Sequence, residues 1–287
     1  MTSLPVLVGV DFSDASLDAA RWAARYLAPE APLVLAHAVY VPQPPSFLRS
    51  LYPPVEPVVE DARRGAEVRL QEVADGLGRD ADLIVRVGRP DDTLRNIAQE
   101  IGAGILVVGA RGERGGVWRL FGSTAERVAR QAPCALLLAR ALPAGPMRSA
   151  LVTVDDSDAA GAVLEWAARF SGVDPERMVL LHVVSGALTG AVRMAAQASE
   201  AREAERKLRK HAEEWLHGLA AAAGLAKAKV EVRLGDAAME ILRAADCHAV
   251  DVVVVGQHGA GHGMFLGSTA EFVLRQGSGP VMLAASR

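Results

Sequence analysis

The sequence of 287 residues predicts an α/β protein made of two tandem, doubly wound parallel-sheet domains. Three observations predict this fold. Strand-like and helix-like segments alternate, most strand-like segments are apolar without a break, and the first half of the chain recurs in the second half. Unbroken apolar strands are typical of parallel sheets covered by helices on both faces. Strand–helix alternation is typical of doubly wound sheets with right-handed crossovers.

The first half is expected to contain five strands joined by four helices. The expected strands are Pro5–Asp11, Leu33–Val39, Asp82–Val87, Gly104–Ala110 and Ala135–Ala139. The expected helices are Ser13–Leu27, Val58–Gly76, Asp91–Ile101 and Ser123–Gln131. Ser13 suits the N-cap of the first helix. The proline-rich segment Val41–Pro57 is either a stiff surface loop or a lid or partner contact.

Matching blocks in the two halves indicate a tandem duplication. Val6–Asp11 matches Ala150–Asp155, and Gly122–Glu126 matches Gly267–Glu271. We therefore expect one domain over residues 1–141, a linker rich in proline and glycine over 142–148, and a second domain over 149–287. In the second half, a helical stretch from about Val192 to Ala223 carries charges of both signs, which indicates a solvated helix face rather than a nucleic-acid surface.

Composition excludes several classes of protein. The chain is 51% hydrophobic with a formal net charge of -3, so it is neither disordered nor basic enough to attract nucleic acid or an anionic membrane. Its longest apolar runs have the length of strands, well short of the ~18–20 residues that span a bilayer. No signal peptide is recognised at the N-terminus, and two cysteines make no disulfide framework. A cytoplasmic location is therefore expected.

A glycine-rich segment after the fourth strand predicts a phosphate site. Its pattern is G-x2-G-x9-G-S, formed by Gly109, Gly112, Gly122 and Ser123. Glycines let the backbone approach a ligand, and the free amides and dipole at the start of the next helix favour an anion. Arg111 lies within this segment, and its permanent positive charge suits phosphate. Ligands of open α/β sheets also bind at the carboxyl ends of strands.

Capping is the alternative explanation for part of this pattern. Ser123–Glu126 and Ser268–Glu271 both read S-x-x-E, the capping-box pattern. Capping explains the serines and glutamates, but it does not explain the glycines directly after a strand. Asp11 and Asp155 end the first strand of each half, and a ligand contact is favoured over a turn role because a serine two residues later can serve as the cap.

Other chemistry finds little support in the sequence. There is no Walker loop, no nucleophile elbow and no kinase signature, and no catalytic residue is assigned. No metal site is expected, because Cys247–His248 precedes a strand whereas His258 and His262 follow it, about 20 Å away. His37 and His182 end apolar strands, where a packing role is favoured over catalysis.

With these motifs in place, the whole chain resembles a tandem universal stress protein. The resemblance is carried by V-x-V-D at Asp11 and Asp155, by the strand ends His37–Ala38 and His182–Val183, and by the G-x2-G-x9-G-S-T-A motif. It implies an adenine-nucleotide-binding, Rossmann-like fold. It also implies that the two halves form an internal pseudo-dimer through their last strands, Ala135–Ala139 and Val281–Ala285, and a homodimer of the tandem chain is compatible with it.

The first half resembles the subgroup of the family that binds ATP, commonly with Mg²⁺. In that subgroup the first-strand aspartate and the residue after the second-strand histidine contact adenine, which implies Asp11, with Val10 beside it, and Ala38. The glycine-rich loop holds ribose and phosphates. The residues implied for this role are Gly109, Gly112, Gly122, Ser123 and Thr124.

The second half departs from the motif, since only seven residues separate Gly259 from Gly267 and histidines replace the arginines of the loop. We therefore expect weaker or altered nucleotide binding there, with ADP, AMP or an empty site as the alternatives. The residues of this second site are Asp155, Val183, Gly256, Gly259, Gly267, Ser268 and Thr269.

The expected function is that of a stress-response regulatory module that binds ATP in its first domain. Its output would be a conformational or oligomeric change sensed by partners rather than turnover. Two alternatives stay open. One is a slow ATPase or an enzyme that transfers nucleotidyl or phosphoryl groups, and the other is an interaction scaffold without nucleotide.

Overall fold

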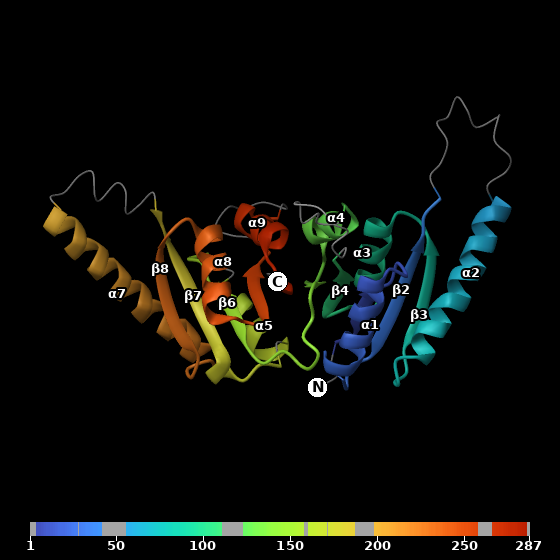
Figure 1. The fold of residues 1–287 in the computed structure, drawn as a ribbon, viewed down its shortest axis with the longest axis horizontal. Helices are drawn as coiled ribbons and strands as arrows, with labels where there is room; N and C mark the ends of the chain where they lie inside the picture. The colour runs from blue at the N-terminus through green and yellow to red at the C-terminus, as the bar shows by residue number, and fades with distance from the viewer. Residues whose placement is uncertain are drawn as a thin grey trace, which may run out of the picture. The chain divides into compact units, whose positions relative to one another are not determined.

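The computed structural model describes residues 4–27, 29–41, 56–110, 123–157, 160–170, 172–186, 198–257 and 266–285 (Figure 1). The loop residues 111–122 and 258–265 and most of the proline-rich segment lie outside these ranges. The described chain divides into two compact units: the first ends at Ala139, and the second continues from Arg140. We call them unit 1 and unit 2, and each is described by itself.

Unit 1 holds the predicted elements of the first half, with ends within two residues of those expected. Its strands are β1 (Val6–Gly9), β2 (Leu33–Val39), β3 (Asp82–Val87), β4 (Ile105–Gly109) and β5 (Ala135–Ala139). Its helices are α1 (Asp14–Tyr26), α2 (Glu56–Asp75), α3 (Pro90–Glu100) and α4 (Ser123–Gln131). The strands run parallel in the order β3-β2-β1-β4-β5.

Unit 2 repeats this topology, with its parallel strands in the order β8-β7-β6-β9-β10. The strands are β6 (Ala150–Thr153), β7 (Met178–Ser185), β8 (Lys229–Gly235), β9 (Val252–Gly256) and β10 (Val281–Ala284). The helices are α5 (Ala160–Phe170), the short 3-10 helix η2 (Pro175–Arg177), α7 (Ala198–Ala222), α8 (Ala237–His248) and α9 (Ser268–Gln276). The repeated topology confirms the predicted tandem α/β fold. The predicted contact between the last strands stays a prediction.

The strand order creates a crevice in each unit. In unit 1 the chain moves outward from β1 to β2 and β3, then returns to the other side of β1 for β4 and β5. Right-handed crossovers then place α1 and α2 on one face of the sheet and α3 and α4 on the other. The direction changes between β1 and β4, and such a switch point opens a crevice at the carboxyl ends of the strands.

The central strands form the core of each sheet, as their unbroken apolar sequences predict. Leu35, Leu7 and Leu106 are fully buried on β2, β1 and β4, the three middle strands of unit 1. Cys134 is also buried, and this burial raises the pKa of its thiol to about 12. The side chain therefore stays an uncharged thiol, as expected of a small residue in the core. Within the described residues, no helix combines the length and apolar character that crossing a membrane requires.

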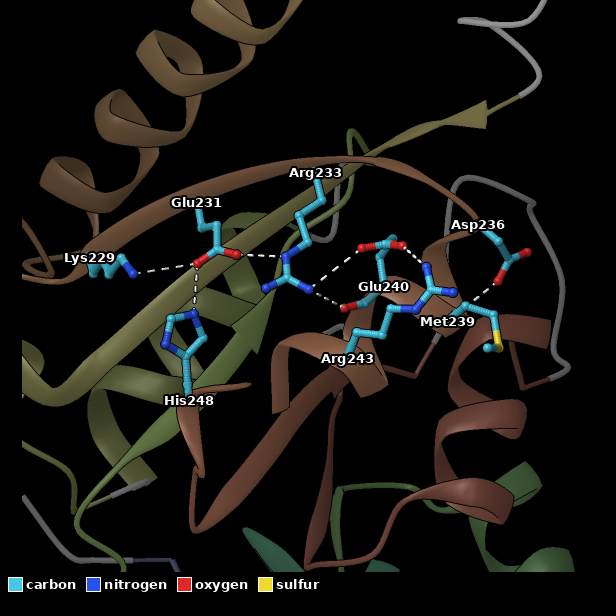
Figure 2. A network of polar contacts seen from close by, with 8 residues as sticks. All are labelled: Lys229, Glu231, Arg233, Asp236, Met239, Glu240, Arg243 and His248. Carbon is cyan, nitrogen blue, oxygen red and sulfur yellow. Dashed lines mark hydrogen bonds and ion pairs between the residues drawn. The ribbon is translucent and has the colours of Figure 1, made fainter. Parts of the chain in front are cut away.

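The outer strands β3 and β8 carry charged side chains that discourage pairing with further strands. Figure 2 shows how such charges join the outer strand β8 to α8 in unit 2. Arg233 donates from Nε to Glu231 at 2.6 Å, and its Nη1 lies 3.5 Å from Glu240. His248 Nε2 lies 2.7 Å from the other carboxylate oxygen of Glu231. Glu231 is therefore the centre of this network.

The network predicts a pH-dependent contribution of Glu231 to stability. Burial opposes its ionisation, but the hydrogen bonds from Arg233 and His248 outweigh burial and lower the pKa of the carboxyl below its ordinary 4.5. Glu231→Gln should therefore lower the free energy of unfolding by about 1–2 kcal/mol at neutral pH. Because the stabilisation requires the carboxylate, the difference should vanish as the pH falls through the lowered pKa.

Urea unfolding of both proteins at neutral and at strongly acidic pH measures this difference. The matched control is Glu203→Gln on α7, which removes the same charge from an exposed pair with Arg206 and should have little effect. An equal loss in both variants would show that the β8–α8 network adds nothing beyond an ordinary surface pair.

Candidate functional site

The turn after β1 is built by Asp11 and Ser13. Ser13 is the N-cap of α1, accepting a hydrogen bond from the Ser16 amide at 3.3 Å, so its predicted capping role is confirmed. The Asp11 carboxylate in turn accepts from the Ser13 amide at 3.0 Å. Asp155 repeats this turn in unit 2, accepting from the Ser157 amide at 3.2 Å. Both aspartates thus have the turn role, and their ligand contacts stay predictions.

Asp11 is nevertheless an exposed anion at the edge of the sheet. Partial burial opposes its ionisation, but hydrogen bonds from Ser13 outweigh it, so the pKa of the carboxyl is lowered. The amide and the hydroxyl of Ser13 both donate to the same carboxylate oxygen of Asp11, Oδ1. At neutral pH the group is an acceptor only, suited to an amino group or a sugar hydroxyl.

His37 and His182 hold the ends of neighbouring strands together. His37 Nδ1 lies 2.7 Å from the Val10 carbonyl oxygen, and His182 Nδ1 lies 2.8 Å from that of Val154. Because a carbonyl only accepts, Nδ1 carries the proton in each ring. These bonds confirm the predicted packing role. The Phe12 ring, next to Asp11, lies 4.5 Å from the His37 ring.

The most informative feature is that β2 continues past the end of β1. The two strands pair up to Gly9 and Ala36, whereas β2 pairs with β3 as far as Val39. The Ala36 carbonyl accepts from Val10 at 2.8 Å, so residue 36 faces β1, and the Val39 carbonyl accepts from Gly88 at 3.0 Å on the β3 side.

Ala38 therefore presents its backbone toward the side of β1, past the last residue of that strand. Backbone groups two residues apart in a strand point to the same side, so Ala38 faces β1 beyond the point where β1 ends. Among the described residues, no hydrogen bond is found to its N–H or C=O on that side. Val183 has the same place in unit 2, because the Leu181 carbonyl two residues earlier accepts from Val154 at 2.9 Å.

Gly109 has a packing role that the sequence did not reveal. A Cβ at this position would lie 2.8 Å from the Ala15 carbonyl carbon and 2.8 Å from the Ser16 amide nitrogen. The start of α1 therefore packs directly against the end of β4. A glycine is needed here whether or not a ligand binds, so its presence alone does not indicate a ligand site.

The start of α9 corrects one prediction. Gly267 is the N-cap, with φ of -61° and ψ of 143°, and Ser268 is the first residue of the helix. Ser268–Glu271 therefore is not a capping box, because the cap position belongs to a residue without a side chain. The aligned helix α4 begins at Ser123, and the residue before it lies outside the described ranges.

A cavity of about 240 Å³ lies beside the Asp11 turn, between α1 and α2. It is lined by Phe12, Leu17, Arg21, Arg69, Glu72, Val73 and Gly76. The Arg69 guanidinium stacks 4.0 Å above the Phe12 ring at one wall. Among the residues that the structure describes, none of those predicted to bind the nucleotide lines this cavity.

A family comparison now identifies the chain. The model of the universal stress protein family matches residues 4–140 and again 147–285. The chain belongs to the universal stress protein family. No match was found among curated proteins.

Solved universal stress proteins share the fold over nearly the whole chain. The protein from Archaeoglobus fulgidus DSM 4304 is 17% identical, covering 99% of this chain and 98% of its own, with a TM-score of 0.68. The putative universal stress protein from Pseudomonas aeruginosa UCBPP-PA14 is 16% identical, covering 99% and 94%, with a TM-score of 0.59. A universal stress protein solved in complex with cAMP is 30% identical over 48% of this chain and 98% of its own, with a TM-score of 0.33.

In this universal stress protein the described site residues end neighbouring strands. Gly9 pairs with Ala36 on one side and with Val108 on the other, so Asp11, Ala38 and Gly109 follow or end adjacent strands of unit 1. Four predicted residues lie outside the described ranges: Arg111, Gly112, Gly122 and Gly259. Among the described residues, no group of three or more His, Cys, Asp or Glu side chains is placed to hold a metal ion.

One buried charge near this edge escaped the sequence reasoning. Asp91, in the first turn of α3, is only 8% exposed and lies 3.1 Å from Arg127 of α4. A comparison of the two halves of the sequence could have indicated this pair. Asp91 aligns with Ala238 and Arg127 aligns with Phe272, so only the first half has charges at these two positions.

Proposed function

We propose that this universal stress protein binds ATP, accompanied by Mg²⁺, in unit 1 and acts as a stress-response binding module rather than as a turnover enzyme. The observation that carries the proposal is the backbone of Ala38, which has no β1 partner because β1 ends first, beside the exposed carboxylate of Asp11. Together these groups offer one donor, the Ala38 N–H, and two kinds of acceptor, the Ala38 carbonyl and the Asp11 carboxylate.

Adenine complements these groups. Its edge presents an amino donor next to a ring-nitrogen acceptor, the pattern that one residue's C=O and N–H can meet together. Val10 contributes packing in this proposal, because its N–H and C=O are already paired with Ala36 and His37. Asp11 adds an acceptor for a further amino or hydroxyl group of the nucleoside.

The start of α4 suits the phosphates. The first amides of a helix have no partner within it, and the helix dipole favours an anion there. In the proposed site, ribose and phosphates contact the loop and this helix start, and Mg²⁺ offsets phosphate charge. The proposed contacts are Gly109, Arg111, Gly112, Gly122, Ser123 and Thr124. Unit 2, with its shorter loop, is proposed to bind more weakly, to hold ADP or AMP, or to stay empty.

Calorimetric titration of the full chain with ATP and Mg²⁺ tests the proposal, together with mass analysis of small molecules released from the purified protein. We expect one tightly bound ATP per chain. ITP is the matched control, because it replaces the amino donor of adenine by an acceptor and the ring acceptor by a donor. The unmatched backbone groups should weaken ITP binding at least about tenfold.

Equal affinity for ATP and ITP would contradict the adenine contact at Ala38. No binding of either nucleotide would favour the scaffold without nucleotide. Single-turnover measurements with labelled ATP distinguish the remaining alternative, since release of one ADP per chain would favour a slow ATPase.

A further inference from the structure

Unit 1 contains an ion pair between α3 and α4, buried at Asp91 and partly exposed at Arg127, and unit 2 has no charged residue at either aligned position. Asp91 Oδ2 lies 3.1 Å from Arg127 Nε and accepts from Arg89 at 3.2 Å. Burial opposes ionisation of Asp91, but the Arg89 hydrogen bond and the Arg127 charge outweigh it, and the pKa of the carboxyl is lowered. The Asp91 side chain is therefore a carboxylate at neutral pH.

The pair is incompletely satisfied. Among the described residues, neither Asp91 Oδ1 nor Arg127 Nε has a hydrogen-bond partner, although both atoms are buried. The 3.1 Å contact is thus an ion pair without hydrogen-bond geometry. Removing charges from water without satisfying their polar atoms costs free energy, so such a pair is weak support for stability.

Unit 2 shows that the fold does not need the pair. Gly88 and Gly235 precede α3 and α8 with nearly the same φ, 156° and 150°, which aligns Asp91 with Ala238. The repeated S-T-A-E at the starts of α4 and α9 aligns Arg127 with Phe272. An alanine and a phenylalanine thus replace the pair in the same architecture.

Arg127 is placed to reach a ligand at the start of α4. It lies four residues after Ser123 and three after Thr124, so the three residues share one face of the helix. Side chains of an α-helix tilt toward its N-terminus, which directs a long arginine back over its first turn. The Arg127 side chain is 42% exposed, whereas its Nε is buried against Asp91.

We infer that Arg127 is a polyphosphate-binding residue of unit 1 and that Asp91 is the positioning residue that orients its guanidinium. This inference rests on the proposed ATP site and adds to it a residue outside the glycine motif. It also explains why unit 2 would bind nucleotide more weakly than unit 1, because Phe272, at the position of Arg127, offers no charge to a phosphate. The pair contributes to the selection of polyphosphate over the bare nucleoside.

The test measures the affinities of the full chain for ATP and for adenosine. Arg127→Gln should lower ATP affinity about tenfold while leaving adenosine affinity unchanged, because a charge-assisted hydrogen bond to phosphate is lost. Asp91→Asn, which keeps the volume of the side chain, should lower the ratio of ATP affinity to adenosine affinity by a smaller factor. Arg130→Gln is the matched control, since it removes the same charge from the same helix at a residue paired with Glu126.

The double variant Asp91→Ala with Arg127→Phe reproduces unit 2 and guards against misfolding of the single variants. It should melt no lower than the wild type and still show the reduced ratio. An unchanged ratio in a wild-type chain that binds ATP would overturn this inference alone. A wild-type chain that binds neither ATP nor adenosine would overturn the proposed function and this inference with it.

Discussion

Replacing Gly109 by alanine should destabilise unit 1 by about 3 kcal/mol, even without nucleotide. The added Cβ would lie 2.8 Å from backbone atoms of Ala15 and Ser16, a distance that real Cβ atoms essentially never show. Backbone atoms cannot rotate away as a flexible side chain can. The start of α1 must therefore move from the end of β4 and loosen the turn that holds Asp11.

Denaturant unfolding measures this effect, with Gly65→Ala as the matched control. Gly65 lies inside α2, where a Cβ would meet nothing within 4 Å, so alanine should stabilise the helix by about 0.5–1 kcal/mol. The same substitution thus has opposite signs at the two sites. If Gly109→Ala unfolds like the wild type, the close packing of α1 on β4 is wrong, and the glycine has to be explained by a ligand.

Gly122→Val should weaken ATP binding by roughly a hundredfold, whereas Gly267→Val should leave it intact. In the proposed site Gly122 precedes the helix start that holds the phosphates, and a β-branched side chain would occupy the space of the ligand. Overpacking of about 3 kcal/mol corresponds to a loss of roughly a hundredfold in affinity. Calorimetric titration with ATP and Mg²⁺ reads out both variants.

The duplication supplies the control for folding. Gly267 is the N-cap of α9, and the repeated G-S-T-A-E sequence aligns it with Gly122, so the same change to valine is made at aligned positions of the two halves. The two variants should therefore melt at similar temperatures while differing in ATP binding. Equal loss in both would place the nucleotide in unit 2 as well as unit 1. Full retention in Gly122→Val would refute the assignment of the loop.

The elements of this fold could be predicted because their signals are local. Each apolar run that became a strand, such as Ile105–Gly109, is recognisable in isolation, and Ser13 caps a helix that begins at the next residue. The duplication then supplied a second copy of the strand and helix signals and so the tandem topology. The capping role predicted for Ser268 was wrong, because the S-x-x-E pattern does not show at which residue the helix begins.

The sequence by itself determined the α/β class, the duplication and the family to which the chain belongs, since these depend on periodicity and on repeated motifs. Only the tertiary structure decided which groups face the crevice. That the Ala38 backbone has no β1 partner follows from where β1 stops relative to β2, and the need for glycine at 109 follows from the approach of α1. The pairing of Asp91 with Arg127 joins two helices far apart in the chain. Such contacts depend on strand register and helix packing, which no local pattern of residues records.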